Sequence, residues 1–110
     1  MAGWFELSKS KDGQYHFVLK AGNAETILSS ELYRGRSSAR KGIKSVQANC
    51  AKDERYARKA SSNGKPFFNL KAGNHQVIGT SEMYNSESSR ENGIASVKAN
   101  GGTTTIKDLT

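Results

Sequence analysis

The chain repeats itself with a period of 51 residues and without a gap. Residues 4–49 match residues 55–100 at 20 of 46 positions, and the matches include apolar, turn and polar residues alike. A unit of this length buries too little apolar surface to be safely stable alone. We therefore expect the two copies to share one core rather than to form two independent domains.

Each copy opens with three short segments in which apolar and polar residues alternate, which is typical of β-strands with one buried face. Phe17 and Leu19 mark the expected core face of the middle segment, and the shift places Phe and Leu there again. Ile27 is expected to point inward from the third segment. Asp12-Gly13 and Asn63-Gly64 predict type I′ hairpin turns between the first two segments, with positive φ at both central positions.

A helix is predicted after the three strands of each copy. In the first copy Ile43, Val46 and Cys50 fall on one helical face. Ser37 and Ser88 are the predicted N-caps, because serine accepts a hydrogen bond from a free amide of the first turn.

Glycine and asparagine recur within the two predicted helices. Gly42 and Gly93 lie beside the apolar face, where a missing side chain predicts a close approach of the helix to a strand. Asn49 and Asn100 are predicted to end the helices.

These elements predict an α+β fold. Residues 103–107 are rich in β-branched side chains and are expected to form a closing strand. The order is then β-β-β-α twice plus one strand, with repeat one at about 4–51 and repeat two at about 55–102. We expect both repeats to belong to a single domain over 1–110.

Three motifs occur twice: Phe-x-Leu-Lys-Ala-x-Asn, Ser-Glu-x-Tyr and Gly-Ile-x-Ser-Val-x-x-Asn. Together they resemble the YegP-like family of small bacterial proteins, in its duplicated form, over essentially the whole chain. The resemblance implies tandem β(3)-α units with pseudo-twofold symmetry. It also implies a single antiparallel-type sheet, exchange of the strand after each helix, and both helices on one face. The family is of unknown function, so the resemblance implies no site residues.

Composition argues for a cytoplasmic protein without a membrane segment. The sequence has one cysteine, no signal-like start and no apolar run approaching the ~20 residues of a membrane helix. We expect a monomer, with weak self-association as the alternative, and no cofactor.

Enzyme motifs are not apparent. The two histidines, His16 and His75, are not repeated by the 51-residue shift, and there is no phosphate-binding loop or nucleophile elbow. The Ser-Glu-x-Tyr motif is interpreted as a structural junction. We therefore expect no enzyme activity, with one alternative: a small-molecule site between the copies, at which Glu31 and Tyr33 would have to converge.

The net charge of +7 favours a binding protein for nucleic acid or another polyanion. A solvated surface, a structural or oligomerisation module, and an anion site at Lys71-Ala72-Gly73-Asn74 and its counterpart in copy one are the alternatives. The candidate polyanion-binding residues are Arg36, Arg40, Lys41, Lys44, Arg55 and Arg58. The candidate stacking and sheet-face residues are Trp4, His16, Lys20, Phe67 and Lys71.

Overall fold

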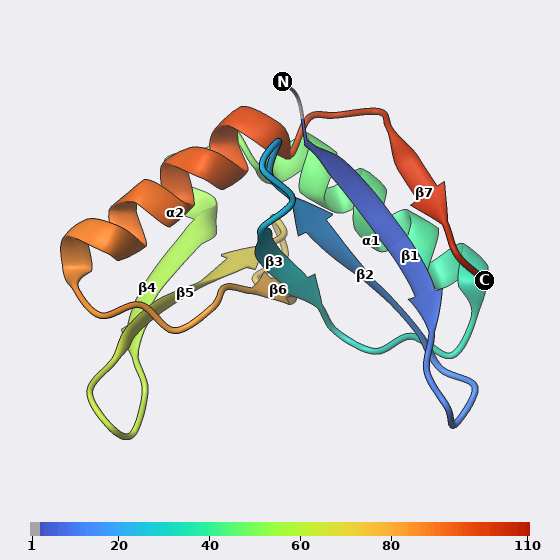
Figure 1. Cartoon of the computed structure of the whole chain (residues 1–110), viewed down its shortest axis with the longest axis horizontal. Coiled ribbons are helices and arrows are strands. Elements are labelled where there is room, and N and C mark those ends of the chain that lie inside the picture. The colour runs from blue at the N-terminus through green and yellow to red at the C-terminus, as the bar shows by residue number, and fades with distance from the viewer. Residues whose placement is uncertain (1–2) are drawn as a thin grey trace.

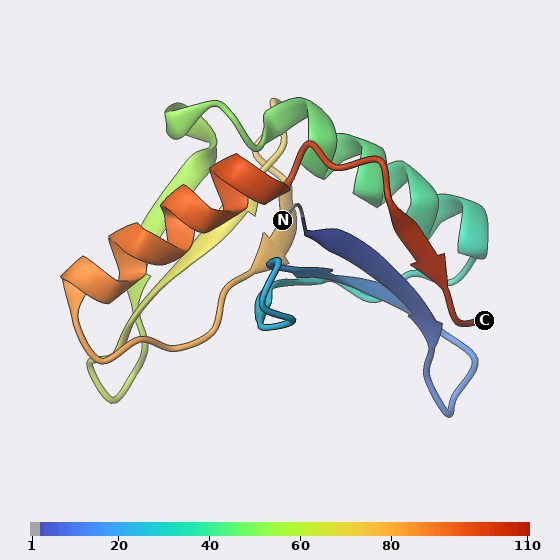
Figure 2. The same cartoon turned by 45° about the horizontal axis from the view of Figure 1, so that its top comes forward.

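Seven strands form one sheet, and two helices lie along the same face of it in the computed structural model, which describes residues 3–110 (Figures 1 and 2). Met1 and Ala2 of the predicted domain lie outside the described residues. In chain order the elements are β1 (Trp4–Lys9), β2 (Tyr15–Lys20), β3 (Thr26–Ser30), α1 (Arg36–Asn49), the 3-10 helix η1 (Asp53–Arg55), β4 (Tyr56–Ala60), β5 (Pro66–Lys71), β6 (Val77–Thr80), α2 (Glu87–Asn100) and β7 (Ile106–Asp108).

The strand order β4-β5-β6-β3-β2-β1-β7 places a pseudo-twofold axis at the centre of the sheet. Ser29 of β3 pairs with Thr80 of β6, and the 51-residue shift makes these two positions equivalent. The two halves of the sheet diverge from this central pair toward the β1–β2 and β4–β5 hairpins (Figure 2). The predicted α+β class and pseudo-twofold arrangement are confirmed.

The strand that follows each helix belongs to the other half of the sheet, as predicted. Strand β4 follows α1 but pairs with β5, and β7 follows α2 but pairs with β1. The sheet is mixed rather than antiparallel throughout, because β7 runs parallel to β1. Strand β1 starts beside the end of α2, where the Gly3 amide donates to Asn100 Oδ1 at 2.9 Å, and β7 runs alongside β1 with Ile106 opposite Phe5 (Figure 1).

One apolar core is built from both copies. Phe17 and Leu19 of the first copy and Phe68 and Leu70 of the second are all fully buried, which confirms the predicted core faces. Burial of such side chains contributes about 1.5–3 kcal/mol each. Because helix α1 contacts β5 and β6 as well as β2, the core continues across the axis.

The predicted turn type of the two hairpins needs correction. Gly13 and Gly64 have positive φ (86° and 81°), but Asp12 and Asn63 do not, so the hairpins are not type I′. The Gly13 amide donates to Ser10 O at 3.0 Å, which fits a three-residue loop that ends in a left-handed glycine.

A β-bulge in β3 turns two successive side chains into the core. Leu19 pairs with Leu28 but Lys20 pairs with Thr26, so Ile27 is the extra residue. Ile27 points inward as predicted, and Leu28, which simple alternation would place on the other face, is also buried.

The N-caps lie two residues before the predicted ones. Gly35 caps α1 without a side-chain bond, and in α2 Ser86 Oγ accepts from the Ser89 amide at 3.0 Å. Ser37 and Ser88 therefore lie inside the first turns. In α2 serines stand on both sides of the boundary, whereas the cap of α1 is a glycine with no side chain to mark it.

Both helices end at the predicted asparagines, and the structure gives the reason. Asn49 Nδ2 donates to Ser45 O, four residues back, while Asn49 Oδ1 accepts from Arg55 Nε at 2.9 Å. Asn100 bonds the helix in the same way and accepts from the Gly3 amide. Each asparagine thus closes its helix and fixes the start of a strand.

The glycines inside the helices make room for the tyrosines of the Ser-Glu-x-Tyr motifs. A Cβ at Gly42 would overlap the Tyr33 hydroxyl and lie 2.9 Å from Phe17 Cε2. A Cβ at Gly93 would overlap the Tyr84 hydroxyl. The predicted close approach exists, but its chief neighbour is a tyrosine rather than the strand itself.

We predict that Gly42→Ala destabilises the fold by about 1–3 kcal/mol, the usual range for overpacking. Adding Tyr33→Phe should recover part of this loss, because it removes the overlapping oxygen. The free energy of unfolding in urea checks both changes. Gly102→Ala is the control, since nothing lies within 4 Å of the added Cβ. Equal stability of wild type and Gly42→Ala would contradict the packing described.

The helix ends meet on the pseudo-twofold axis, where only one side chain fits. Cys50 and Gly101 are equivalent positions, and a Cβ at Gly101 would lie 2.6 Å from Cys50 Cβ. Cys50 itself is buried.

We predict that Gly101→Cys lowers the free energy of unfolding by about 1–3 kcal/mol. The double variant Cys50→Gly with Gly101→Cys should lose less stability, because only one side chain then occupies the axis. A double-mutant cycle in urea measures the coupling. Additive effects of the two substitutions would show that the positions do not compete for space.

Candidate anion-binding surface

Four basic residues line the exposed side of α1. We call Arg36, Arg40, Lys41 and Lys44 the α1 basic surface. Arg36, Arg40 and Lys44 recur every four residues, so they lie on one helical face over about 12 Å. The equivalent positions of α2 are Glu87, Glu91, Asn92 and Ala95. Four positive charges on one helix thus correspond to two negative charges on the other.

Two of these residues are paired with one acid. Arg36 forms an ion pair with Asp108 of β7, and Arg40 Nη2 lies 3.1 Å from the same carboxylate. Hydrogen bonds from Thr110 and Arg36 hold the pKa of Asp108 well below its usual range. Within residues 3–110, Lys41 and Lys44 form no ion pair with an acidic side chain.

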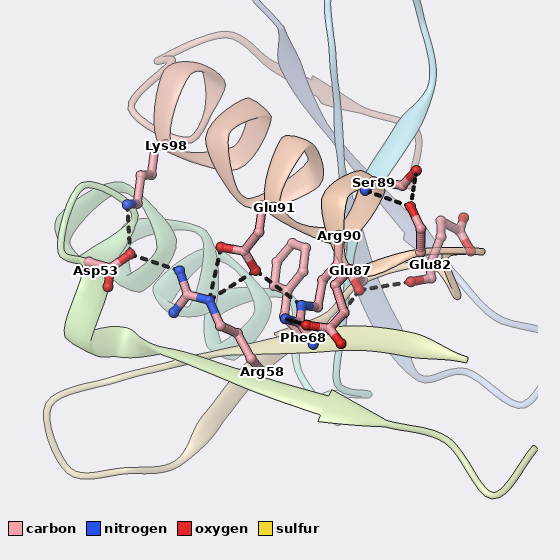
Figure 3. Close-up of polar contacts among 11 residues, drawn as sticks. Asp53, Arg58, Phe68, Glu82, Glu87, Ser89, Arg90, Glu91 and Lys98 are labelled. Atoms are coloured by element: carbon pink, nitrogen blue, oxygen red, sulfur yellow. Dashed lines mark hydrogen bonds and ion pairs between the residues drawn. The ribbon is translucent and has the colours of Figure 1, made fainter. Parts of the chain in front are cut away.

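Ion pairs also join α2 to the segment that follows α1 (Figure 3). Arg58 of β4 bonds Glu91 at 3.0 Å and Asp53 at 3.0 Å. Lys98 reaches the same Asp53 oxygen at 2.8 Å. Hydrogen bonds from Lys98 and Arg58 lower the pKa of Asp53.

The two sets of ion pairs have opposite polarity. Arg40 and Glu91 are equivalent helix positions, and each bonds the strand that follows the other helix. Arginine on α1 bonds an aspartate of β7, whereas glutamate on α2 bonds an arginine of β4. Ion pairing therefore explains part of the charge difference between the helices. It does not explain Lys41 and Lys44.

A groove of about 360 Å³ separates α1 from β7, and we call it the α1 groove. Its lining residues are Ser37, Arg40, Lys41, Lys44, Gln47 and Ile106. Three of the residues that α1 contributes are basic, and Ile106 is the residue contributed by β7.

The remaining predicted polyanion-binding residues lie apart from this surface. Arg55 donates from Nε to Asn49 at the end of α1, and Arg58 is held between Asp53 and Glu91. Arg58 also lies on β4, an edge strand of the sheet, where charge discourages pairing with another chain. The six predicted residues are thus not one cluster.

The predicted stacking residues occupy the opposite face of the sheet. Trp4 pairs with Lys20 next to the fully buried pair Phe5 and Leu19, so alternation directs both away from the helices. His16, Phe67 and Lys71 alternate with core residues in the same way. The sheet lies between these residues and the α1 basic surface.

The aromatic side chains do not form one stacking platform. The Lys107 ammonium lies 4.2 Å from the Trp4 ring centroid, and the indole nitrogen donates to Glu6 at 2.8 Å. His16 Nε2 lies 3.3 Å from Ser8 Oγ. Four strand spacings, about 19 Å, separate the strand of Trp4 from that of Phe67. One base could not contact both.

The Ser-Glu-x-Tyr motif builds a junction, as interpreted from the sequence. Ser30 Oγ accepts from the Phe17 amide at 2.9 Å and donates to Glu31 O at 2.7 Å. The Tyr33 ring stacks on Phe17 with 6.3 Å between centroids, and Ser81 and Tyr84 repeat the arrangement in copy two. Burial, and next the charge of Glu31, raise the pKa of Tyr33, which disfavours its use as a base.

The required convergence of Glu31 and Tyr33 is not seen. Tyr33 lines a cleft between the copies, but Glu31 is exposed and does not line that cleft. In the part of the chain that the structure describes, no three His, Cys, Asp or Glu residues are grouped to hold a metal ion. No helix among these residues has the length and apolarity needed to cross a membrane.

We predict that Asp108→Asn reduces the acid sensitivity of the fold. A carboxylate whose pKa is lowered by folding contributes stability above its unfolded value of about 3.9, and this contribution is lost as the pH falls through the lower folded pKa. Unfolding free energies between pH 5 and pH 2 should therefore fall less steeply in the variant. Glu54→Gln, at an exposed acid with no ion pair in residues 3–110, is the control. Parallel pH profiles for wild type and Asp108→Asn would contradict the prediction.

Comparison with known proteins gives one family. The model of the domain of unknown function DUF1508 matches twice, over residues 10–56 and 61–108. The UPF0339 protein YegP of Escherichia coli (strain K12) is 66% identical over 110 residues, with all of both chains covered. A UPF0339 protein of Acinetobacter baylyi is 64% identical over 110 residues, covering 100% of this chain and 99% of its own.

Two solved structures are similar over the whole chain. The solution NMR structure of a UPF0339 protein from Shewanella oneidensis has a TM-score of 0.94 at 63% identity, with 93% of that chain covered. The solution NMR structure of yegP from E. coli, titled a protein of unknown function, has a TM-score of 0.95 at 65% identity, with 95% covered. The two family matches and the full-length likeness show that this chain is a duplicated member of the DUF1508 (UPF0339) family, whose function is unknown.

Proposed function

We propose that this protein is a non-enzymatic binding protein for a polyanion, with nucleic acid as the favoured partner, and that it binds through the α1 basic surface. One observation carries the proposal. At four equivalent positions of the two helices, α1 carries four positive charges and α2 carries two negative charges, on a shared core.

Lys41 and Lys44 are the residues on which the proposal depends most. Ion pairing with Asp108 accounts for Arg36 and Arg40, but in residues 3–110 no acid accounts for the two lysines. A lysine with no internal partner is free to replace a counterion of a phosphate chain, and this release drives nonspecific binding. The α1 groove beside them gives such a chain a defined path.

Sequence-independent binding is expected. No aromatic residue lines the α1 groove, and the sheet-face aromatics lie on the other side of the molecule. Binding should therefore use phosphates rather than bases, with little difference between single and double strands.

We predict that Lys41→Asn with Lys44→Ala weakens binding to a fluorescein-labelled oligonucleotide about tenfold or more at 50 mM salt. These substitutions install the residues that α2 carries at the same positions. The slope of log affinity against log salt should fall by about 2, since each lost phosphate contact removes about 0.9. Fluorescence anisotropy across a salt series measures both quantities.

The matched control is Asn92→Glu with Ala95→Glu, which changes the net charge equally at the equivalent positions of α2. This control should bind nearly as well as wild type. No binding by wild type at 50 mM salt, or the same loss in both variants, would rule out the proposed surface.

A further inference from the structure

A second hollow, of about 230 Å³, lies between the two copies, and we call it the junction cleft. Helix α1 and Tyr33 form one wall, and the β5–β6 turn with the start of β6 forms the other. Its lining residues are Tyr33, Ser38, Lys41, Gly42, Ser45, Ala72, Asn74, Gln76, Val77 and Ile78. The cleft exists only because the two copies pack together.

Hydrogen-bond donors gather in this cleft. Five of the lining residues carry side-chain donors: Lys41, Tyr33, Ser38, Asn74 and Gln76. Asn74 Oδ1 accepts from the backbone N–H of Gln76 at 3.1 Å, which fixes the turn and leaves the Asn74 NH₂ group as a donor. Within residues 3–110, the Lys41 ammonium and the Tyr33 hydroxyl have no protein partner. Donors around one cation are the groups that an oxyanion needs.

The equivalent positions in the other copy provide an internal comparison. They keep the tyrosine, both serines and the asparagine of the cleft, as Tyr84, Ser89, Ser96 and Asn23. Two polar positions differ in charge: Asn92 replaces Lys41, and Glu25 replaces Gln76. The charge of Glu25 is felt there, since it adds to burial and Glu82 in raising the pKa of Tyr84. Glu31 acts on Tyr33 as Glu82 acts on Tyr84, so the junctions differ in that the first has Lys41 and the second has Glu25, on the same hydroxyl framework.

Size limits the ligand. The volume of about 230 Å³ corresponds to roughly eight water molecules at about 30 Å³ each, which suits a phosphate with a body of two or three carbons. Val77, Ile78 and Ala72 offer apolar contact for that body, and the Asn74 and Gln76 amides suit its hydroxyls.

We propose that the junction cleft binds a small phosphomonoester, with the phosphate at Lys41 and a short hydroxylated body against Asn74 and Gln76. This site goes beyond the proposed polyanion surface. Lys41 borders both, but Gln76 belongs to the cleft alone and Lys44 to the α1 groove alone.

The test is a ¹H–¹⁵N NMR titration of the full chain with glycerol 1-phosphate and, separately, with uncharged glycerol. Glycerol phosphate should shift the side-chain amides of Asn74 and Gln76 and the backbone near Lys41, whereas glycerol should not. Lys41→Asn with Gln76→Glu, which installs the residues of the other junction, should weaken binding at least tenfold. Gln76→Glu alone should weaken it, whereas Lys44→Ala should leave it unchanged.

The reciprocal change makes the test sharper. Asn92→Lys with Glu25→Gln should create a second site, seen as new shifts at Asn23 and the residues around position 92. Equal shifts with glycerol and glycerol phosphate, or shifts that respond to Lys44→Ala but not to Gln76→Glu, would overturn the proposal. The latter pattern would instead indicate binding of phosphate to the α1 basic surface.

Discussion

The crossing of the chain between the two halves of the sheet is the constraint on which the rest of the structure depends. After α1 the chain crosses to begin copy two with β4 beside β5, and after α2 it crosses back, so that β7 extends copy one at β1. The apolar core crosses the axis for the same reason. Packing at the axis is tight enough that Cys50 and Gly101 cannot both carry a side chain, and the identity of the copies has to break there.

Ion pairs accompany both crossings of the chain between the halves of the sheet. Exposed ion pairs contribute only about 0.2–1 kcal/mol each, so the pairs at Arg40 and Glu91 matter less for stability than for the choice of partner. At each helix the ion-pairing side chain has the sign opposite to that of the strand residue it meets, so both observed contacts are complementary in charge.

The sequence was sufficient to predict the repeats, the core faces and the C-terminal ends of both helices, because each depends on a local pattern that occurs twice. It was insufficient where the cause lies far along the chain. The partner of Arg40 is Asp108, 68 residues later, and no pattern links them. Gly42 leaves room for the hydroxyl of Tyr33, which lies nine residues earlier in the sequence. Only the folded structure shows that this tyrosine packs against the helix. The cap positions failed for other reasons: several serines compete at α2, and the cap of α1 is a glycine.

The duplication also offers a way to separate structural from functional charge. Where the copies differ and the fold supplies a partner, as at Arg40 and Glu91, the difference serves assembly. Where they differ and the fold supplies none, as at Lys41 and Asn92, the difference has no structural cause within residues 3–110. Lys41 borders both the α1 groove and the junction cleft, and Lys44 and Gln76 each border one of them. In a chain built from two copies of one unit, we expect a binding function to show as differences between the copies. Such differences should occur at positions outside the core that no ion pair explains.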